Sequence, residues 1–141
     1  MRIVENNLTP NIFTSLRKTG PFKSYQDEDI AIAIKNSLYT IYVLDDSEKP
    51  IGMARVVGDG RIAFFIKDVV VIPENQGRYI GTIIMEHVLA YIKAHCCDDA
   101  YVGLMSTPHK EGFYEKFGFL RRPNDEYGAG MIMYVSKGAS K

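Results

Sequence analysis

Hydrophobic and polar residues change their spacing several times along the chain, and each change marks an element of secondary structure. Three runs rich in β-branched and aromatic residues predict strands: residues 37–46, 51–57 and 61–73. The turn sequences Ser-Glu-Lys-Pro and Val-Gly-Asp-Gly separate these runs, and Asp-Gly is a strong hairpin signal. Links this short join neighbouring strands of opposite direction, so we expect an antiparallel meander.

After Pro73 the apolar spacing becomes helical and predicts an amphipathic helix over about residues 79–95. Its apolar positions are Ile80, Ile83, Ile84, Val88, Tyr91 and Ile92. Residues 100–106, Ala-Tyr-Val-Gly-Leu-Met-Ser, predict a further buried strand. A helical crossover joins parallel strands, so this strand should run parallel to the one that precedes the helix.

The N-terminal part contains shorter elements. Residues 1–20 indicate a short strand followed by a short helix, and residues 24–37 predict a second helix. In this second helix Ser24 and Asp27 fit a capping box, and three consecutive acids lie at the positive end of the helix dipole. Helix-start chemistry explains these acids better than an amine-binding patch does.

The C-terminal part predicts a short helix over residues 109–119, which Gly118 ends at the C′ position, and a last strand over residues 130–136. The elements therefore follow the order meander, helix, strand, helix, strand. This order predicts a mixed sheet of the α+β or α/β kind. The sequence contains no repeat, low-complexity tract or linker, so we expect residues 1–141 to form a single domain.

Composition narrows the functional classes. Of the 141 residues, 46% are hydrophobic, which suits one domain with a substantial core. The formal net charge is zero, so nothing indicates a nucleic-acid partner. No apolar run approaches the ~20 residues that span a bilayer, so we expect no membrane partner either.

The cysteines and histidines indicate neither a disulfide framework nor a metal site. Cys96 and Cys97 are adjacent and form no Cys-x-x-Cys pattern, so we expect a reducing, cytoplasmic location. His87 and His95 share a helix face with Tyr91, but a zinc site needs more ligands than these two. We therefore expect no metal.

The sequence Gln-Gly-Arg-Tyr-Ile-Gly, residues 76–81, connects a predicted strand to a predicted helix. The free N–H groups of a first helical turn favour an anion, and Arg78 adds a positive charge. A Walker A loop is excluded because no Lys-Ser/Thr pair follows the glycines. A dinucleotide fingerprint is excluded because one glycine is missing and antiparallel hairpins precede the strand. The diphosphate of coenzyme A is the third candidate.

Two motifs resemble those of the GNAT superfamily of acyl-CoA-dependent N-acetyltransferases. Residues 69–88, VVVIPENQGRYIGTIIMEHV, are similar to its Val-x-Pro strand end followed by Gln/Arg-x-x-Gly-x-Gly/Ala and a helix. Residues 112–119, GFYEKFGF, are similar to its later Phe-Tyr-x-x-x-Gly-Phe motif. The resemblance covers roughly residues 30–135. It implies an antiparallel β-meander followed by a β-α-β crossover with a splayed central sheet, and acetyl-CoA as the co-substrate.

The resemblance also implies roles for individual residues. The backbone of Val69, Val70 and Val71 would pair with the pantetheine arm of coenzyme A. Tyr114 would donate to the departing sulfur. The cradle of the diphosphate would consist of Gln76, Gly77, Arg78, Tyr79, Ile80, Gly81 and Thr82.

The chain departs from the family pattern at three places: Tyr79, Val102 and Thr107, where an asparagine often precedes the tyrosine. Tyr79 stands where a glycine is usual, and a positive φ would cost a tyrosine about 1–2 kcal/mol. We therefore expect Tyr79 to begin the helix with a negative φ and to turn its ring outward. The strand over residues 100–106 lacks the glutamate that serves some relatives as a base. Asp68 is our candidate base, because it is a charge in an apolar strand; a solvent-facing or ion-paired structural role explains it equally well.

Together these features predict direct transfer of an acetyl group from acetyl-CoA to a small primary amine in a ternary complex. Cys96 and Cys97 would lie at the far end of the helix from the cofactor turn, which argues against an acyl-cysteine intermediate. Two alternatives stay open: an acetyltransferase for peptide N-termini or lysines, and a module that senses coenzyme A without turnover. The final strand also leaves a homodimer open.

Overall fold

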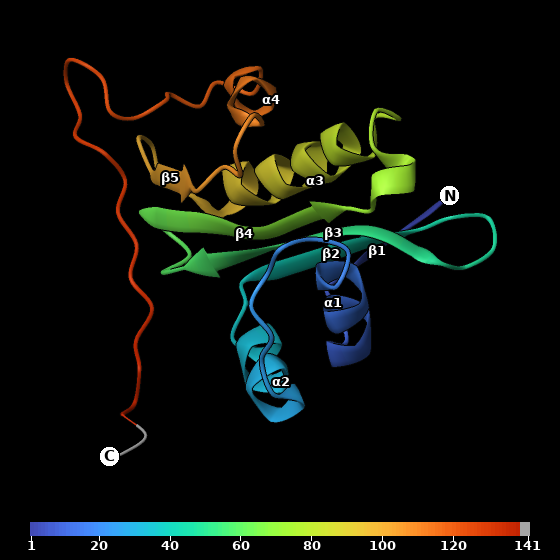
Figure 1. Cartoon of the computed structure of the whole chain (residues 1–141). Helices are drawn as coiled ribbons and strands as arrows, with labels where there is room; N and C mark the ends of the chain where they lie inside the picture. The colour runs from blue at the N-terminus through green and yellow to red at the C-terminus, as the bar shows by residue number, and fades with distance from the viewer. Residues whose placement is uncertain (139–141) are drawn as a thin grey trace. The chain divides into compact units, whose positions relative to one another are not determined.

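The computed structural model describes residues 1–138. Five strands form one mixed sheet in the order β1-β2-β3-β4-β5 (Figure 1). Their bounds are Arg2–Glu5, Tyr39–Leu44, Pro50–Gly58, Ala63–Val71 and Tyr101–Leu104. β1 to β4 are antiparallel to one another in turn, and β5 is parallel to β4. The predicted meander, the crossover and the mixed α+β sheet are confirmed.

The chain divides into two compact units, Met1–Leu104 and the residues from Met105 onward. The expectation of a single domain stays a prediction. No helix of residues 1–138 is both long enough and apolar enough to cross a membrane.

The first unit has helices on both faces of its sheet. α1 spans Pro10–Arg17, α2 spans Asp27–Lys35 and α3 spans Ile80–His95. α3 covers one face, while α1 and α2 lie on the other (Figure 1). Because both faces are covered, every residue of β2 is buried rather than every second one. The largest fully buried side chains include Leu16, Ile41, Ile51, Met53, Phe64, Ile84 and Met85.

The starts of α1 and α2 differ in how they are capped. At α1 the Thr9 hydroxyl accepts from the Ile12 N–H at 3.3 Å. α2 begins at Asp27 after Gln26, and no side chain caps it, so the expected capping box of Ser24 and Asp27 is wrong. The three acids instead form the first turn of α2, where they interact favourably with the helix dipole.

One carboxylate organises the Asp-Gly link between β3 and β4. Asp59 Oδ1 accepts from the backbone N–H groups of residues 61–63 at 2.8–3.1 Å. These backbone bonds, that of Arg61 first, lower the pKa of the Asp59 carboxyl. The hairpin predicted at this link is confirmed, because β3 and β4 pair antiparallel on either side of it.

A bulge divides β4 into two halves. Met53 pairs with Val70 but Arg55 pairs with Lys67, so two residues of β4 oppose one residue of β3. The pairing of β4 with β5 ends at Ile66. Among residues 1–138 no strand pairs with the outer edge of β4 beyond that point. The sheet is therefore splayed where β4 passes its bulge.

The second unit forms one helix among its described residues, α4 over Glu111–Glu115. The helix is capped at Lys116, and Gly118 follows two residues later with a φ of 97°. Gly118 was expected at the C′ position, but Phe117 holds that position. Gly118 follows it in the left-handed conformation.

The last predicted strand is wrong. Residues 130–136 form no strand, and the side chains of Met131 and Met133 are 88% and 80% exposed. An apolar, β-branched pattern shows that a segment fits a pleated surface. It becomes a strand only where another strand completes its ladder, and the pattern does not supply that strand.

Gly52 allows α3 to approach β3 closely. A Cβ at this position would lie 2.9 Å from Ile84 Cδ1 and 3.1 Å from the Val70 carbonyl oxygen. We expect Gly52→Ala to destabilise the fold by about 1–3 kcal/mol, because the added methyl group overpacks the helix–sheet contact. Thermal unfolding measures this loss. Gly112→Ala is the matched control, since a Cβ there meets nothing within 4 Å. Equal melting temperatures for Gly52→Ala and the wild type would contradict this role for Gly52.

Candidate active site

The segment between β4 and α3 makes a tight turn. A short 3₁₀ helix, η1 (Pro73–Asn75), leaves the strand, and Gln76 ties it back: Gln76 Nε2 donates to the Val71 carbonyl oxygen at 2.9 Å. Gly77 follows with a φ of 78°, a left-handed conformation that glycine adopts without strain. A Cβ on Gly77 would meet nothing within 4 Å, so backbone conformation and not lack of space calls for glycine.

The start of α3 is suited to an anion. Ile80, Gly81 and Thr82 are its first three residues, and N–H groups at a helix start have no acceptor within the helix. The positive end of the helix dipole and the guanidinium of Arg78 act in the same direction. The structure therefore gathers the predicted cradle, residues 76–82, at one helix end.

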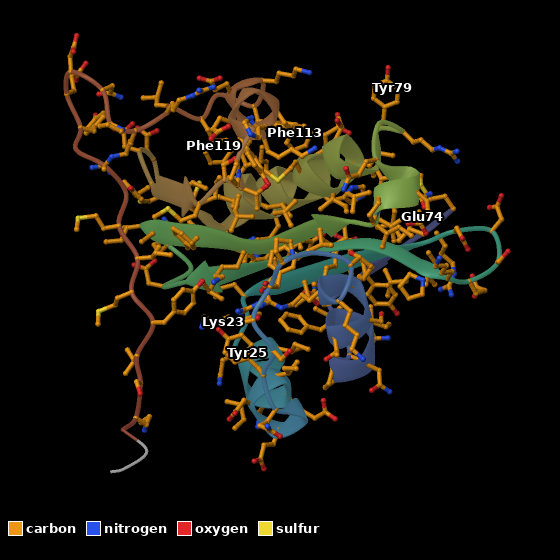
Figure 2. All side chains as sticks on the ribbon, in the orientation of Figure 1. Lys23, Tyr25, Glu74, Tyr79, Phe113 and Phe119 are labelled. Carbon is orange, nitrogen blue, oxygen red and sulfur yellow. The ribbon has the colours of Figure 1, made fainter. Side chains whose placement is uncertain are left out.

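Tyr79 corrects one prediction and confirms another. It is the N-cap of α3 with a φ of 65° and a ψ of 9°, so the expected negative φ is wrong. Its ring is 77% exposed and projects away from the ribbon, as expected (Figure 2). The backbone at this position needs the left-handed conformation, which explains why a glycine would suit it and why tyrosine is strained there.

The outer edge of β4 leads into this turn. On the inner edge, the Ile72 N–H donates to the Ile51 carbonyl oxygen of β3 at 3.0 Å. Backbone groups of successive strand residues point to opposite edges, so those of Val71 point away from β3, while those of Val70 and Ile72 face it. The Val71 carbonyl oxygen accepts from Gln76 Nε2, and the Val71 N–H lies at the outer edge. The stretch that the sequence selected for the pantetheine arm therefore offers backbone groups along the part of β4 that β5 does not cover.

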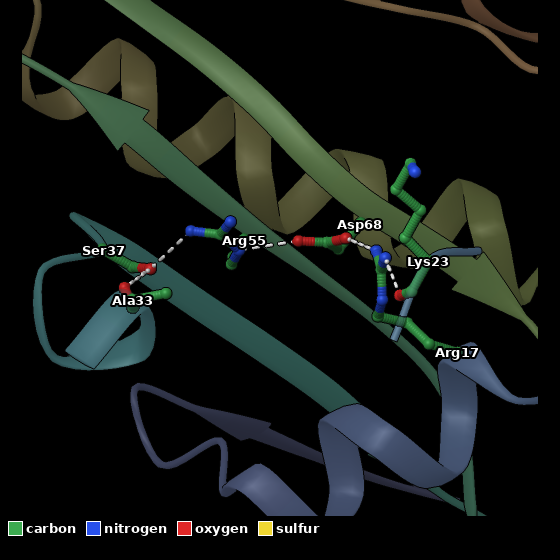
Figure 3. A network of polar contacts seen from close by, with 6 residues as sticks. All are labelled: Arg17, Lys23, Ala33, Ser37, Arg55 and Asp68. Carbon is green, nitrogen blue, oxygen red and sulfur yellow. Dashed lines mark hydrogen bonds and ion pairs between the residues drawn. The ribbon is translucent and has the colours of Figure 1, made fainter. Parts of the chain in front are cut away.

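Asp68 occupies the bulge of β4 with a φ of 57°. Its side chain is 2% exposed, and both carboxylate oxygens are bound (Figure 3). Oδ1 accepts from Arg17 Nη1, and Oδ2 accepts from Arg55 Nε at 2.6 Å. Of the two roles that the sequence left open, this geometry supports the ion-paired structural one, because a base needs a lone pair directed at the amine.

Sequence reasoning missed the two arginines. Arg55 carried a usable signal: it is the only charge in the apolar run 51–57, as Asp68 is a charge in the next run. In a hairpin, such charges lie near each other across the strands. Arg17 gave no such signal, since it lies 51 positions before Asp68 and on a different element.

Tyr114 lies on α4 in a cluster of aromatic rings. Its ring makes edge contacts with those of Phe113 and Phe119, at centroid distances of 5.0 and 6.2 Å. Burial raises the pKa of the Tyr114 phenol from 10.0 to about 12. The hydroxyl is therefore protonated throughout the neutral range and is able to donate a hydrogen bond.

The cysteines and histidines lie outside this arrangement. Cys96 follows the last residue of α3, so it lies at the opposite end of a helix of 16 residues from Tyr79, as predicted. Among residues 1–138 no three His, Cys, Asp or Glu side chains gather as metal ligands would. His87 Nδ1 and His95 Nδ1 instead lie 3.0 and 2.8 Å from backbone carbonyl oxygens one turn earlier.

Comparisons with known proteins identify the family of this chain. A family model described as an acetyltransferase (GNAT) domain matches residues 37–121, more than half of the chain. The chain belongs to the GNAT acetyltransferase family. The match crosses the boundary between the two units and includes the turn, the start of α3 and α4.

Individual relatives agree with this assignment. Serotonin N-acetyltransferase 2, chloroplastic, from Oryza sativa subsp. japonica is 31% identical over 121 residues, which cover 82% of this chain. The chain spans 58% of the length of that curated relative.

Solved structures share the fold. SA2161 from Meticillin-resistant Staphylococcus aureus, a probable acetyltransferase of unknown function, has a TM-score of 0.84 and 31% identity, with 94% of this chain and 98% of that chain covered. A GNAT family protein, SP0256 from Streptococcus pneumoniae, has a TM-score of 0.77 and 25% identity, with 97% and 98% covered.

Relief of the strain at Tyr79 is directly measurable. Tyr79→Gly should be more stable than Tyr79→Ala by about 1 kcal/mol, since alanine keeps the penalty of a positive φ and glycine does not. In thermal unfolding this difference corresponds to a shift of about 2–4 °C. Both variants lose the exposed ring, so its packing does not confound the comparison. Equal stabilities would show that the left-handed conformation is not retained at this position.

Proposed function

We propose that this protein is an acetyl-CoA-dependent N-acetyltransferase that acetylates a primary amine by direct attack in a ternary complex. The main support for this proposal is that an uncovered strand edge continues directly into an anion-suited turn. The uncovered edge of β4 beyond the Asp68 bulge leads straight into an anion-suited turn at the start of α3. A cofactor with an extended arm and a diphosphate fits such an arrangement.

The residues present fit coenzyme A. At the outer edge of β4, the backbone of Val69 and the N–H of Val71 would pair with the amides of the pantetheine arm, as an added strand would. The N–H groups at the start of α3, with Arg78, would bind the diphosphate. The space around Gly77, where a Cβ would meet nothing within 4 Å, leaves room for a phosphate beside the backbone.

The chemistry needs few groups. The neutral amine nitrogen attacks the thioester carbonyl carbon, the C–S bond breaks, and coenzyme A leaves as a thiolate while the nitrogen loses a proton. Holding the two reactants in contact supplies the largest part of the rate enhancement. A backbone N–H at the end of β4 would polarise the carbonyl oxygen.

Tyr114 would stabilise the departing sulfur. A phenol with a pKa of about 12 is a weaker acid than a thiol, whose ordinary pKa is about 8.5. We therefore assign Tyr114 a hydrogen bond to the developing thiolate, which leaves as the thiolate and takes its proton from solvent. The sequence pattern supports this role, and its burial keeps the donor protonated.

The proton of the amine needs a separate route. Asp68 stays a prediction as its acceptor, and the two guanidinium groups on its oxygens argue against that role. A chain of water molecules leading to solvent is the alternative that we favour. Either route leaves the amine neutral at the moment of attack.

The acceptor is proposed to be a small primary amine, with peptide N-termini and lysines as the alternative. A hollow lined by Tyr25, Gln26, Asp27 and Glu28 lies at the start of α2, where the acids interact with the helix dipole and would also attract an ammonium group. The name of the rice relative makes arylalkylamines the first compounds to test. The cytoplasmic location and the homodimer stay predictions.

A thiol-release assay tests the proposal. Acetyl-CoA consumption is measured with arylalkylamines, polyamines, aminoglycosides and short peptides at neutral pH. Turnover of a small amine above that of peptides supports the proposed acceptor, and the reverse order supports the peptide alternative. Tight binding of acetyl-CoA without turnover of any amine would instead favour a coenzyme A sensor.

Tyr114→Phe is the sharpest test of the mechanism. The variant should lose at least tenfold in kcat, because it removes the donor to the sulfur, while the Kd for acetyl-CoA stays within twofold. Tyr127→Phe, at an exposed tyrosine of the same unit, is the matched control and should keep full activity. Unchanged turnover in Tyr114→Phe would remove this role.

The pH dependence follows from the raised pKa of Tyr114. Since burial moves this pKa to about 12, the phenol keeps its proton up to that pH and is not the group that titrates at lower pH. Any alkaline loss of activity below pH 11 should therefore occur at the same pH in the wild type and in Tyr114→Phe. A loss that disappears in the variant would contradict the assignment.

A further inference from the structure

The guanidinium of Arg17 contacts more than Asp68. Its Nη2 donates to the Lys23 carbonyl oxygen at 2.9 Å, in the segment of residues 18–26 that we call the α1–α2 loop (Figure 3). Its central carbon lies 4.9 Å from the ring centroid of Phe22 and 5.7 Å from that of Tyr25. One planar cation therefore joins the bulge of β4 to three residues of the α1–α2 loop.

The other arginine extends the same network to α2. Arg55 Nη1 donates to Ser37 Oγ at 3.3 Å, and Ser37 Oγ donates to the Ala33 carbonyl oxygen at 2.9 Å. The side chains of Arg17 and Arg55 are only 13% and 14% exposed. Water therefore screens these charges little, and the Asp68 carboxylate fixes both guanidinium groups in place.

The network lies on the face of the sheet opposite α3, from which the proposed acceptor amine would approach. This step rests on the proposed function, in which the acyl group lies along the outer edge of β4. α3 and the diphosphate turn occupy one face of the sheet, and α1 and α2 lie on the other (Figure 1). An amine that approaches from the second face meets the α1–α2 loop, whose last residues line the hollow at Tyr25 and Gln26.

We propose that Arg17, anchored by Asp68, is a positioning residue for the acceptor amine. It holds the α1–α2 loop against the bulge of β4, so that the loop forms the acceptor side of the site. Asp68 acts through Arg17 and Arg55 and does not accept the proton of the amine. The Asp68 carboxylate therefore shapes the bulge of β4 and, through Arg17, also holds the α1–α2 loop in place.

Arg17→Lys is the main variant, because it keeps a cation beside Asp68 and should fold. Lysine lacks the planar fork that binds Asp68 and the Lys23 carbonyl together while contacting the rings. We expect the KM for the amine to rise at least fivefold, while kcat and the Kd for acetyl-CoA stay within twofold. Arg17→Met should raise this KM further. Arg2→Met, at an exposed arginine paired with Glu48, is the matched control and should change nothing.

The KM-against-kcat split separates positioning from a merely structural role. A general loss of folded protein lowers the apparent kcat and leaves the KM for the amine unchanged, and that result would overturn the proposal. So would an unchanged KM in both Arg17 variants that still turn over the amine.

A second readout does not depend on activity. Limited trypsin digestion of the full chain, followed by mass spectrometry, measures cleavage after Lys18 and Lys23 in the α1–α2 loop. Arg17→Lys should be cut at these sites at least fivefold faster than the wild type at equal melting temperature. If no amine is turned over, the proposed function fails, but the digestion still tests whether Arg17 anchors the α1–α2 loop. Equal cleavage rates in Arg17→Lys and the wild type would show that Arg17 does not anchor this loop.

Asp68→Asn distinguishes an anchor from a base. If Asp68 is an anchor, Asp68→Asn should raise the KM for the amine as the Arg17 variants do. The acid limb of the pH profile of kcat should then be unchanged. If Asp68 is the base, Asp68→Asn should abolish kcat and the acid limb with little change in the KM for the amine. That result would overturn our assignment. Asp68→Glu, which keeps the charge at a different length, should restore part of the acceptor affinity only if Asp68 is an anchor.

Discussion

The carboxylate of Asp68, held between the guanidinium groups of Arg17 and Arg55, is the interaction on which the geometry of β4 depends. A buried charge is stable only when it is paired and hydrogen-bonded, and here both oxygens are bound. The pairing also holds a non-glycine residue in the left-handed conformation within a strand, where it is otherwise disfavoured. The bulge that results bends β4 just beyond the end of its pairing with β5.

From the bulge, the cofactor side of the proposed site follows in order along the chain. The uncovered edge of β4, the turn at Gly77 and the first turn of α3 are consecutive, so a short stretch of chain sets their relative positions. Gly52 contributes from the neighbouring strand, because the absence of its Cβ lets α3 lie close to the sheet. Of two strained positions, Asp68 precedes this stretch and Tyr79 lies within it. Strained backbone conformations concentrate at functional sites, since the surrounding structure must hold them there.

The proposed chemistry relies on position more than on acid–base groups. Tyr114 has its pKa raised by burial, which makes it a durable hydrogen-bond donor and a poor acid. Asp68 has its oxygens bound and is better suited to hold the α1–α2 loop than to accept a proton. Such a site would discriminate among amines through the shape and charge of its acceptor side, which the Arg17 contacts order.

The sequence by itself determined the order of the elements, the antiparallel meander, the parallel crossover and the place of the anion-suited turn. These features depend on apolar spacing and on links of a few residues, which are local properties. The tertiary structure decided the partners of Asp68, the left-handed φ of Tyr79, the start of α2 at Asp27 and the absence of a strand over residues 130–136. Arg17 and Asp68 are 51 positions apart, and a strand needs a neighbour to pair with. No local stretch of sequence determines the ion pair of Arg17 with Asp68 or the pairing of a strand. Both form only when segments distant in the sequence come into contact.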